Sequence, residues 1–139
     1  MAAIRASGVL RWGADEAGGA PYEFRNPKNP DERIGFEVEI AEEIGRRLGL
    51  RIEFVQTNWA QLLPALEIGN FDMAMSGIEV TPDRKASVDF TRPYYIFAQQ
   101  LVVRAGETGI KNLDDCRGRK VGTLGASACL LYTSDADDD

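Results

Sequence analysis

The sequence predicts an α/β protein built on a doubly wound, mostly parallel β-sheet. Three observations lead to this fold class. Segments rich in β-forming residues alternate with segments of helical period, the connections between them are short, and the composition, 44% apolar and 27% charged, is that of a globular protein. Strand, helix, strand, helix and strand in that order favour right-handed crossovers, which lay the strands parallel. The 139 residues suffice for one domain of ordinary size.

The first expected strand covers residues 9–14, where Val-Leu-Arg-Trp-Gly-Ala follows a break at Ser7-Gly8. Residues 15–21 are rich in glycine and acids and form a loop at this strand's carboxyl end. A short extended piece at 22–24 precedes a turn cluster at 26–31, in which two prolines exclude a helix. We interpret the loop through Arg33 as a surface insertion.

Residues 36–48 show helical period, with apolar residues at every fourth position and glutamates ahead of arginines (Phe36, Ile40, Ile44 and Leu48 form the apolar stripe, with Ala41 and Gly45 beside it). Gly49 ends this helix, and the alternating residues 51–55 form the second strand. Asn58 is a candidate N-cap for a helix over 59–68 with three leucines facing inward, although Pro64 indicates an irregular first turn.

An apolar run at 71–75 predicts the third strand, and a polar stretch from Ser76 to Arg84 follows it. Thr81-Pro82 within this stretch is a turn or helix-start signal. Ligands of open α/β sheets bind just outside the carboxyl ends of the strands, where Arg84 could meet a carboxylate with two parallel hydrogen bonds. An ordinary turn followed by a solvated arginine explains this stretch equally simply.

The rest of the chain begins a second module. A β-type run covers residues 98–104, a polar linker 105–110, a helical turn 112–117, a further strand 119–124, and a strand-to-helix turn 125–127. Residues 129–139 end in aspartates without a core pattern, and we expect them to be a non-native tail.

Composition excludes several functions. A formal charge of −6 argues against nucleic-acid binding, and the absence of histidine excludes histidine bases and histidine metal ligands. Cys116 and Cys129 lack zinc-site spacing, and the sequence leaves their pairing open. We therefore expect neither a metal nor a cofactor. The first residues form no secretory leader, so the protein is either cytoplasmic or has lost its leader.

Taken together, several motifs resemble those of the polar amino acid solute-binding proteins of ABC transporters, the family-3 periplasmic binding proteins. The resemblance covers about residues 4–128. The motifs are Gly-Val-Leu-Arg-Trp-Gly at 8–13, Pro-Tyr-Glu-Phe at 21–24, Gly-Phe-Glu-Val-Glu-Ile-Ala at 35–41, Asn-Trp-Ala-Gln-Leu-Leu-Pro-Ala-Leu at 58–66, the stretch 76–84 with Val-Asp-Phe at 88–90, Pro-Tyr-Tyr at 93–95, and Arg-Gly-Arg-Lys-Val-Gly at 117–122. Their shared order and spacing make the signal specific.

The resemblance implies a type II-like periplasmic binding fold whose two lobes close over an amino acid. Residues 1–104 would be the first lobe and residues 105–128 the hinge with the first strand of the second. The parent protein would be about twice as long, carry a secretion signal or lipid anchor, work outside the cytoplasm and deliver its ligand to a membrane permease.

Site roles carry over residue by residue. The resemblance implies that Arg84 clamps the ligand α-carboxylate, that backbone groups of Ser76 and Gly77 assist, that Trp59 forms one wall of the side-chain pocket, and that Ser127 adds donors from the second lobe. We expect the Arg84 guanidinium to have no carboxylate of its own chain beside it. Trp59 could instead be a core aromatic residue.

Two departures from the family pattern bear on the ligand. Glu79 stands where a small hydroxyl residue is usual, and Gly19 replaces a second aromatic wall. Counting back from Pro21, Glu16 falls where some basic-amino-acid binders place an acid. Two carboxylates near the pocket would favour a cationic or otherwise polar amino acid. Alternatively, Glu16 is solvated and Glu79 binds only the α-ammonium group.

Two other functions stay open. Cyclohexadienyl dehydratases share this fold and clamp a carboxylate with the same arginine, but their catalytic acid comes from the second lobe. Sensory modules of histidine kinases and domains fused to lytic transglycosylases also resemble this family, and only further sequence would reveal such a fusion. We do not expect an enzyme.

Overall fold

A computed structural model of the chain describes residues 2–98, 100–125 and 127. The chain divides into two compact units, Met1–Thr91 and Arg92–Asp139, which are described one at a time. The division into lobes at residue 104 stays a prediction. No helix among the described residues is both long and apolar enough to cross a membrane.

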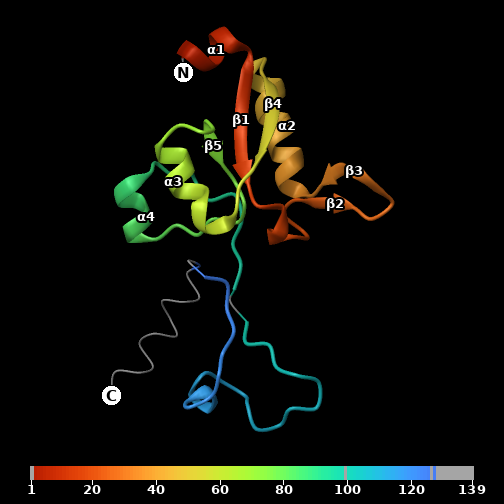
Figure 1. Ribbon diagram of the computed structural model, residues 1–139, viewed down its shortest axis with the longest axis vertical. Helices are drawn as coiled ribbons and strands as arrows, with labels where there is room; N and C mark the ends of the chain where they lie inside the picture. The colour runs from red at the N-terminus through yellow and green to blue at the C-terminus, as the bar shows by residue number, and fades with distance from the viewer. Residues whose placement is uncertain (1, 99, 126, 128–139) are drawn as a thin grey trace. The chain divides into compact units, whose positions relative to one another are not determined.

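The first unit is organised around a three-stranded parallel sheet in the order β4-β1-β5 (Figure 1). β1 (Val9–Ala14) lies in the centre and pairs along its whole length with β4 (Arg51–Gln56). On the other side, β5 (Met73–Ala74) pairs only with Trp12 and Gly13. The predicted parallel sheet of an α/β fold is confirmed.

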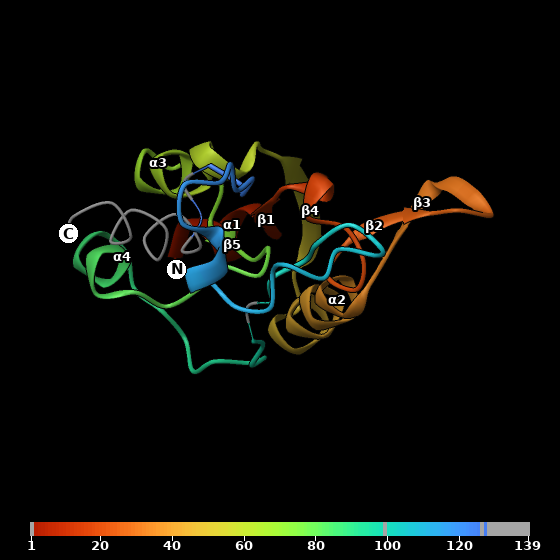
Figure 2. The same ribbon diagram turned by 90° about the horizontal axis from the view of Figure 1, so that it is seen from below.

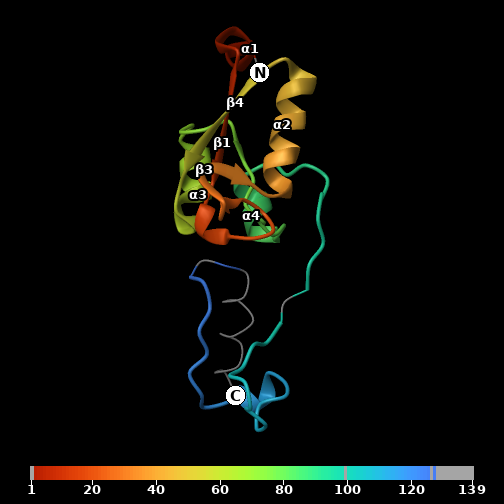
Figure 3. The same cartoon turned by 90° about the vertical axis from the view of Figure 1, so that its right-hand side faces the viewer.

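Helices cover both faces of this sheet (Figure 3), as a doubly wound fold requires. One face packs against α2 (Phe36–Leu48), and its core contains Trp12, Ala14, Ala41 and Met75. The other face packs against η2 (Trp59–Gln61) and α3 (Leu62–Glu67), and its core contains Leu62, Ala65 and Phe71. Two small cores therefore hold the sheet between them.

α2 has the predicted bounds, and Ile40 of the predicted stripe packs against the core that contains Ala41. Its buried residues are Glu37, Ala41 and Gly45, whereas Leu48 of the predicted apolar stripe is 44% exposed. A Cβ atom on Gly45 would lie 2.8 Å from the carbonyl oxygen of Leu50. Small residues therefore let the helix approach the β4 side of the sheet more closely than large apolar residues would.

Residues 24–34 form a hairpin where a loop was expected. β2 (Phe24–Asn26) and β3 (Asn29–Ile34) pair antiparallel, and the ribbon extends away from the sheet (Figure 2). The prolines exclude a helix, as expected, but each strand of a two-stranded ribbon has an unpaired edge on which proline is tolerated. A short helix, α1 (Ala2–Ser7), also precedes β1, where only a lead-in was expected.

Of the two helix-start signals, Thr81 caps its helix as predicted, whereas Asn58 precedes η2 (Trp59–Gln61) without a side-chain capping hydrogen bond. The irregular beginning expected before Pro64 is the 3₁₀ turn η2, which leads into α3. Thr81 caps α4 (Pro82–Ser87), since its side chain accepts a hydrogen bond from the backbone N–H of Arg84 at 3.3 Å. This cap places Arg84 in the first turn of a short helix.

In the second unit, the described residues contain one 3₁₀ turn, η3 (Asp114–Cys116). The β-rich segments at 100–104 and 119–124 are not paired into strands there. A strand draws its hydrogen bonds from a neighbour, and the described part of this unit supplies none. Cys129 and the expected non-native tail lie outside the described residues.

Candidate ligand-binding site

Arg84 and Glu79 form a sheltered ion pair in the segment that follows β5. The Arg84 Nη1 atom lies 2.6 Å from Glu79 Oε2, and the two side chains are 15% and 18% exposed. The same Nη1 donates to the backbone carbonyl of Glu79 at 3.0 Å. The expectation that no carboxylate of this chain neutralises Arg84 was therefore wrong. The turn between β5 and α4 brings the two side chains together.

Trp59 lies beside this ion pair. The Arg84 guanidinium carbon is 5.6 Å from the centroid of the Trp59 ring, within the range of a cation–π contact. Trp59 also packs on the core beneath α3, and its buried Nε1 atom has no hydrogen-bond partner among the described residues. The tryptophan thus has both the core contact of the simpler interpretation and the position beside Arg84 that a pocket wall requires.

Asp15, which the sequence analysis did not select, joins the carboxyl ends of all three strands. Its carboxylate accepts from the backbone N–H of Ala17 at 3.0 Å, from Nε2 of Gln56 at 3.0 Å, and from the backbone N–H of Trp59 at 2.7 Å. Its own N–H donates to the Ser76 hydroxyl at 3.2 Å. As the first acid after a central strand, it could have been found by its position alone.

Two fully buried glutamates hold the loop after β5. The Ser76 hydroxyl donates to Oε1 of Glu23 at 2.7 Å, and the N–H of Gly77 donates to Oε1 of Glu37 at 2.9 Å. These donors serve the protein's own carboxyl groups, so any ligand contacts of Ser76 and Gly77 stay predictions. In the sequence, both glutamates stand between apolar neighbours, a signal of burial that we did not use.

The pKa of Glu23 is raised to about 9. Burial of the carboxyl group is the main cause, and a hydrogen bond with Glu37 adds to it, since two carboxyl groups in one dry site favour holding a proton. At neutral pH Glu23 is therefore protonated, and the Ser76 hydroxyl donates its hydrogen bond to a neutral carboxyl group.

Glu16 lies on η1 (Glu16–Gly18) and is paired with arginines of the β2–β3 hairpin. Its Oε2 accepts from Arg25 Nε at 3.0 Å and from Arg33 Nη2 at 2.7 Å. The Arg33 guanidinium in turn lies 3.3 Å from the centroid of the Phe54 ring on β4. Glu16 thus fastens the hairpin to the sheet, and its charge is compensated within the chain.

Ser127 belongs to the second unit. It is 6% exposed, and its hydroxyl donates to the carbonyl of Leu124 at 2.6 Å. The helix that it was expected to begin lies outside the described residues, so its role toward a ligand stays a prediction.

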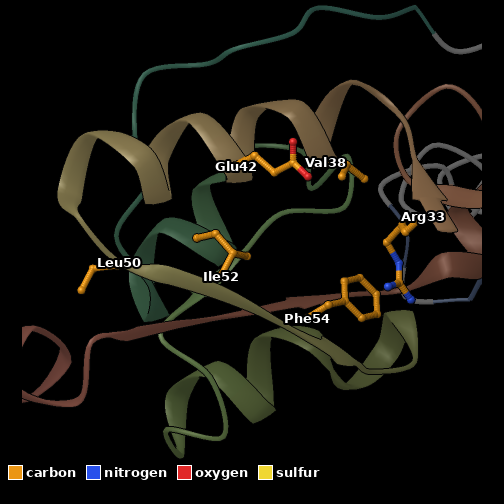
Figure 4. A pocket seen from close by; sticks show the side chains of 6 residues that line it. All are labelled: Arg33, Val38, Glu42, Leu50, Ile52 and Phe54. Carbon is orange, nitrogen blue, oxygen red and sulfur yellow. The ribbon is translucent and has the colours of Figure 1, made fainter. Parts of the chain in front are cut away.

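A hollow of about 450 Å³ lies elsewhere in the first unit, between α2 and the outer strand β4 (Figure 4). It is lined by Arg33, Val38, Glu42, Leu50, Ile52 and Phe54. None of the predicted ligand residues is among them. In the described parts of the chain, no three metal-binding side chains gather, so we assign no metal to either place.

Comparison with known proteins gives one family. The model of the bacterial extracellular solute-binding proteins, family 3, matches residues 10–136. A probable histidine-binding protein of Campylobacter jejuni is 35% identical over 108 residues, which are 77% of this chain and 42% of that protein. The arginine-binding extracellular protein ArtP of Bacillus subtilis is 35% identical over 102 residues, 73% of this chain and 38% of its own. The chain thus spans about two fifths of these relatives.

Solved structures agree in fold. A truncated ArgBP from T. maritima in its arginine-bound form has a TM-score of 0.90 at 30% identity, covering 99% of this chain and 64% of that chain. A mutant of the arginine-bound form of domain 1 from TmArgBP has a TM-score of 0.63 at 34% identity, covering 68% and 70%. An ancestral cyclohexadienyl dehydratase has a TM-score of 0.61 at 35% identity, covering 67% and 37%.

Proposed function

This chain belongs to family 3 of the bacterial extracellular solute-binding proteins, and from that premise we propose that it recognises a polar amino acid for delivery to an ABC importer. The observation that carries the proposal is the Arg84 side chain, 15% exposed, in the first turn of α4 after the parallel strand β5 and beside the Trp59 ring. A guanidinium binds a carboxylate through parallel hydrogen bonds, and every free amino acid supplies one.

In this proposal, some residues contact the ligand and others hold those residues in position. Arg84 binds the α-carboxylate, and the Trp59 face packs against the ligand side chain, or against its charge in a cation–π contact of roughly 0.5–2 kcal/mol. Asp15 fixes the backbone of Trp59, and Glu23 and Glu37 fix the loop that carries Ser76 and Gly77. Buried hydrogen bonds therefore hold in place Trp59 and the loop of Ser76 and Gly77, which contribute to the proposed site together with Arg84.

We propose cationic amino acids as the first ligands to test. The relatives named above include arginine- and histidine-binding proteins. A surplus of acids does not support this choice, because Glu16 is paired with two arginines of this chain and Glu79 with one. A membrane permease as partner and a location outside the cytoplasm are also parts of this proposal, supported by family membership.

The test is a titration of the ¹⁵N-labelled 139-residue chain with arginine, lysine, glutamine and glutamate, followed by NMR. The TmArgBP domain 1 structure, in its arginine-bound form, supports testing this chain without a complete second lobe. We expect saturable shifts of the Trp59 indole N–H signal with at least one amino acid. If none of the four moves this signal at millimolar concentration, the proposal fails.

The ancestral dehydratase structure favours a second candidate, an enzyme acting on prephenate or arogenate. Both curated relatives reported above are named as binding proteins, and on that basis we rank binding first. Incubation of the full-length parent protein with either compound, followed by chromatography, separates the two functions, because the catalytic acid of these dehydratases comes from the second lobe. A binding protein returns the compound unchanged, whereas a dehydratase releases water, carbon dioxide and an aromatic product.

A further inference from the structure

Glu79 offers Arg84 the group that a ligand would offer. Its Oε2 atom lies 2.6 Å from Arg84 Nη1, the length of a strong charge-assisted hydrogen bond. Because both side chains are more than four fifths buried, solvent screens this pair less than it screens a surface ion pair. A ligand carboxylate that takes Nη1 as one of its two donors therefore has to compete with Glu79 for that atom.

Displacing Glu79 from Arg84 places a second requirement on the ligand. Once a ligand carboxylate replaces it on Arg84, Glu79 has a sheltered negative charge beside another one, and like charges at this distance oppose binding. A positive group on the ligand removes the conflict by pairing with the released carboxylate. The backbone carbonyl of Glu79, which also accepts from Arg84, keeps the residue next to the fork.

We propose, on the basis of the function proposed above, that Glu79 is a specificity-determining residue whose carboxylate holds the Arg84 guanidinium until a ligand arrives and then receives the ligand's positive group. The preferred ligands carry a carboxylate and a cation within reach of each other. Dicarboxylates without an ammonium group, and ligands with a second acid, are disfavoured. A small hydroxyl residue at position 79 could neither form an ion pair with Arg84 nor repel an anion.

The first experiment needs no ligand. A thermodynamic cycle compares the urea midpoints of the 139-residue chain and of its Glu79→Gln, Arg84→Gln and doubly substituted variants. We expect the double variant to lose less than the sum of the two single losses, since each single change breaks the same pair. Strictly additive midpoint shifts would overturn the role of Glu79 as the internal partner of Arg84.

The second experiment measures selectivity. Dissociation constants for arginine and for glutarate, a dicarboxylate without an ammonium group, are obtained by NMR titration of the chain, Glu79→Gln and Glu79→Ser. Glu67→Gln, which removes an exposed charge at the end of α3, is the control. We expect the preference for arginine over glutarate to fall about tenfold or more in both Glu79 variants and to stay unchanged in the control.

The outcomes separate the two proposals. If arginine binds and its preference over glutarate is the same within about twofold in all four proteins, Glu79 does not set specificity and only this inference is overturned. If none of the amino acids tested binds any of the proteins, the proposed function fails and this inference fails with it. The serine variant guards against a fold defect of the glutamine variant, and the ¹H–¹⁵N spectrum of each protein verifies its fold.

Discussion

The hydroxyl group of Ser76 donates a hydrogen bond of 2.7 Å to Oε1 of Glu23, and both residues are buried. The contact joins the segment before the hairpin to the loop at the end of β5. Because the pKa of Glu23 is raised to about 9, the folded chain holds a proton on this buried acid at neutral pH, whereas the unfolded chain does not. The stability of the loop that carries Ser76 therefore depends on pH.

Glu23→Gln should change how stability depends on pH. The carboxyl pKa is 4.5 in the unfolded reference and about 9 in the folded chain, so between these values only the folded chain holds the proton. The stabilisation is complete below the lower value and decreases as pH rises toward 9, by at most about 1.4 kcal/mol per pH unit for one proton. Glutamine does not titrate, so this dependence on pH disappears. The free energy of unfolding of the variant should therefore rise relative to that of the unsubstituted chain as pH rises.

Urea unfolding at pH 5, 7 and 8.5 checks this prediction, with Glu39→Gln on the exposed side of α2 as the control. If the free energies of unfolding of Glu23→Gln and of the unsubstituted chain changed with pH in the same way, Glu23 would not be protonated in the folded state and the prediction would be wrong.

Asp15→Ala should destabilise the first unit by about 3 kcal/mol. The substitution leaves three donors, two of them backbone N–H groups, without the carboxylate that now accepts from them. Asp31→Ala, on the exposed hairpin, removes the same charge without a comparable loss. The free energy of unfolding in urea measures both, and equal values for the two variants would contradict the role of Asp15 at the strand ends.

Gly13→Ala should destabilise by about 1–3 kcal/mol through overpacking. A Cβ atom at this position of β1 would lie 2.3 Å from Cζ of the buried Phe71 ring. At Gly122 an added Cβ meets nothing within 4 Å, so Gly122→Ala serves as the control. Thermal unfolding compares the two, and a neutral Gly13 variant would mean that the ring does not pack against β1.

Glu16→Gln should cost about 1 kcal/mol or less and leave arginine binding unchanged. The residue is one third exposed and pairs with Arg25 and Arg33, as surface ion pairs do. Urea unfolding and NMR titration measure the two effects. A tenfold loss of affinity for arginine would contradict this prediction. It would support the place near the ligand that the spacing of Glu16 from Pro21 had suggested.

Local patterns explain what the sequence predicted well. The bounds of β1 and α2 follow from a β-rich run and from helical spacing closed by Gly49, and the parallel order follows from short connections. The start of α4 follows from Thr81-Pro82, a signal contained within a few residues. These features depend on neighbours in the chain, which a sequence displays directly.

Contacts between distant residues explain what was missed. Asp15 acts through Gln56, Trp59 and Ser76, which are all more than 40 positions away in sequence. The pairing of Glu79 with Arg84 is local in sequence, but it depends on how one turn folds two flexible side chains together. On α2 the burial of Glu37 was missed, whereas Ala41 and Gly45, whose small size allows close approach to the sheet, stood beside the predicted apolar stripe.

The most direct test of the central claim, that Arg84 binds the ligand carboxylate, is NMR titration of arginine into the 139-residue chain and its Arg84→Lys variant, with Lys85→Gln as the charge control. Lysine keeps the charge but lacks the fork of the guanidinium. We expect the Arg84→Lys variant to bind arginine at least about tenfold more weakly, while the control binds like the parent chain. Equal affinity of the Arg84→Lys variant and the parent chain would contradict the account.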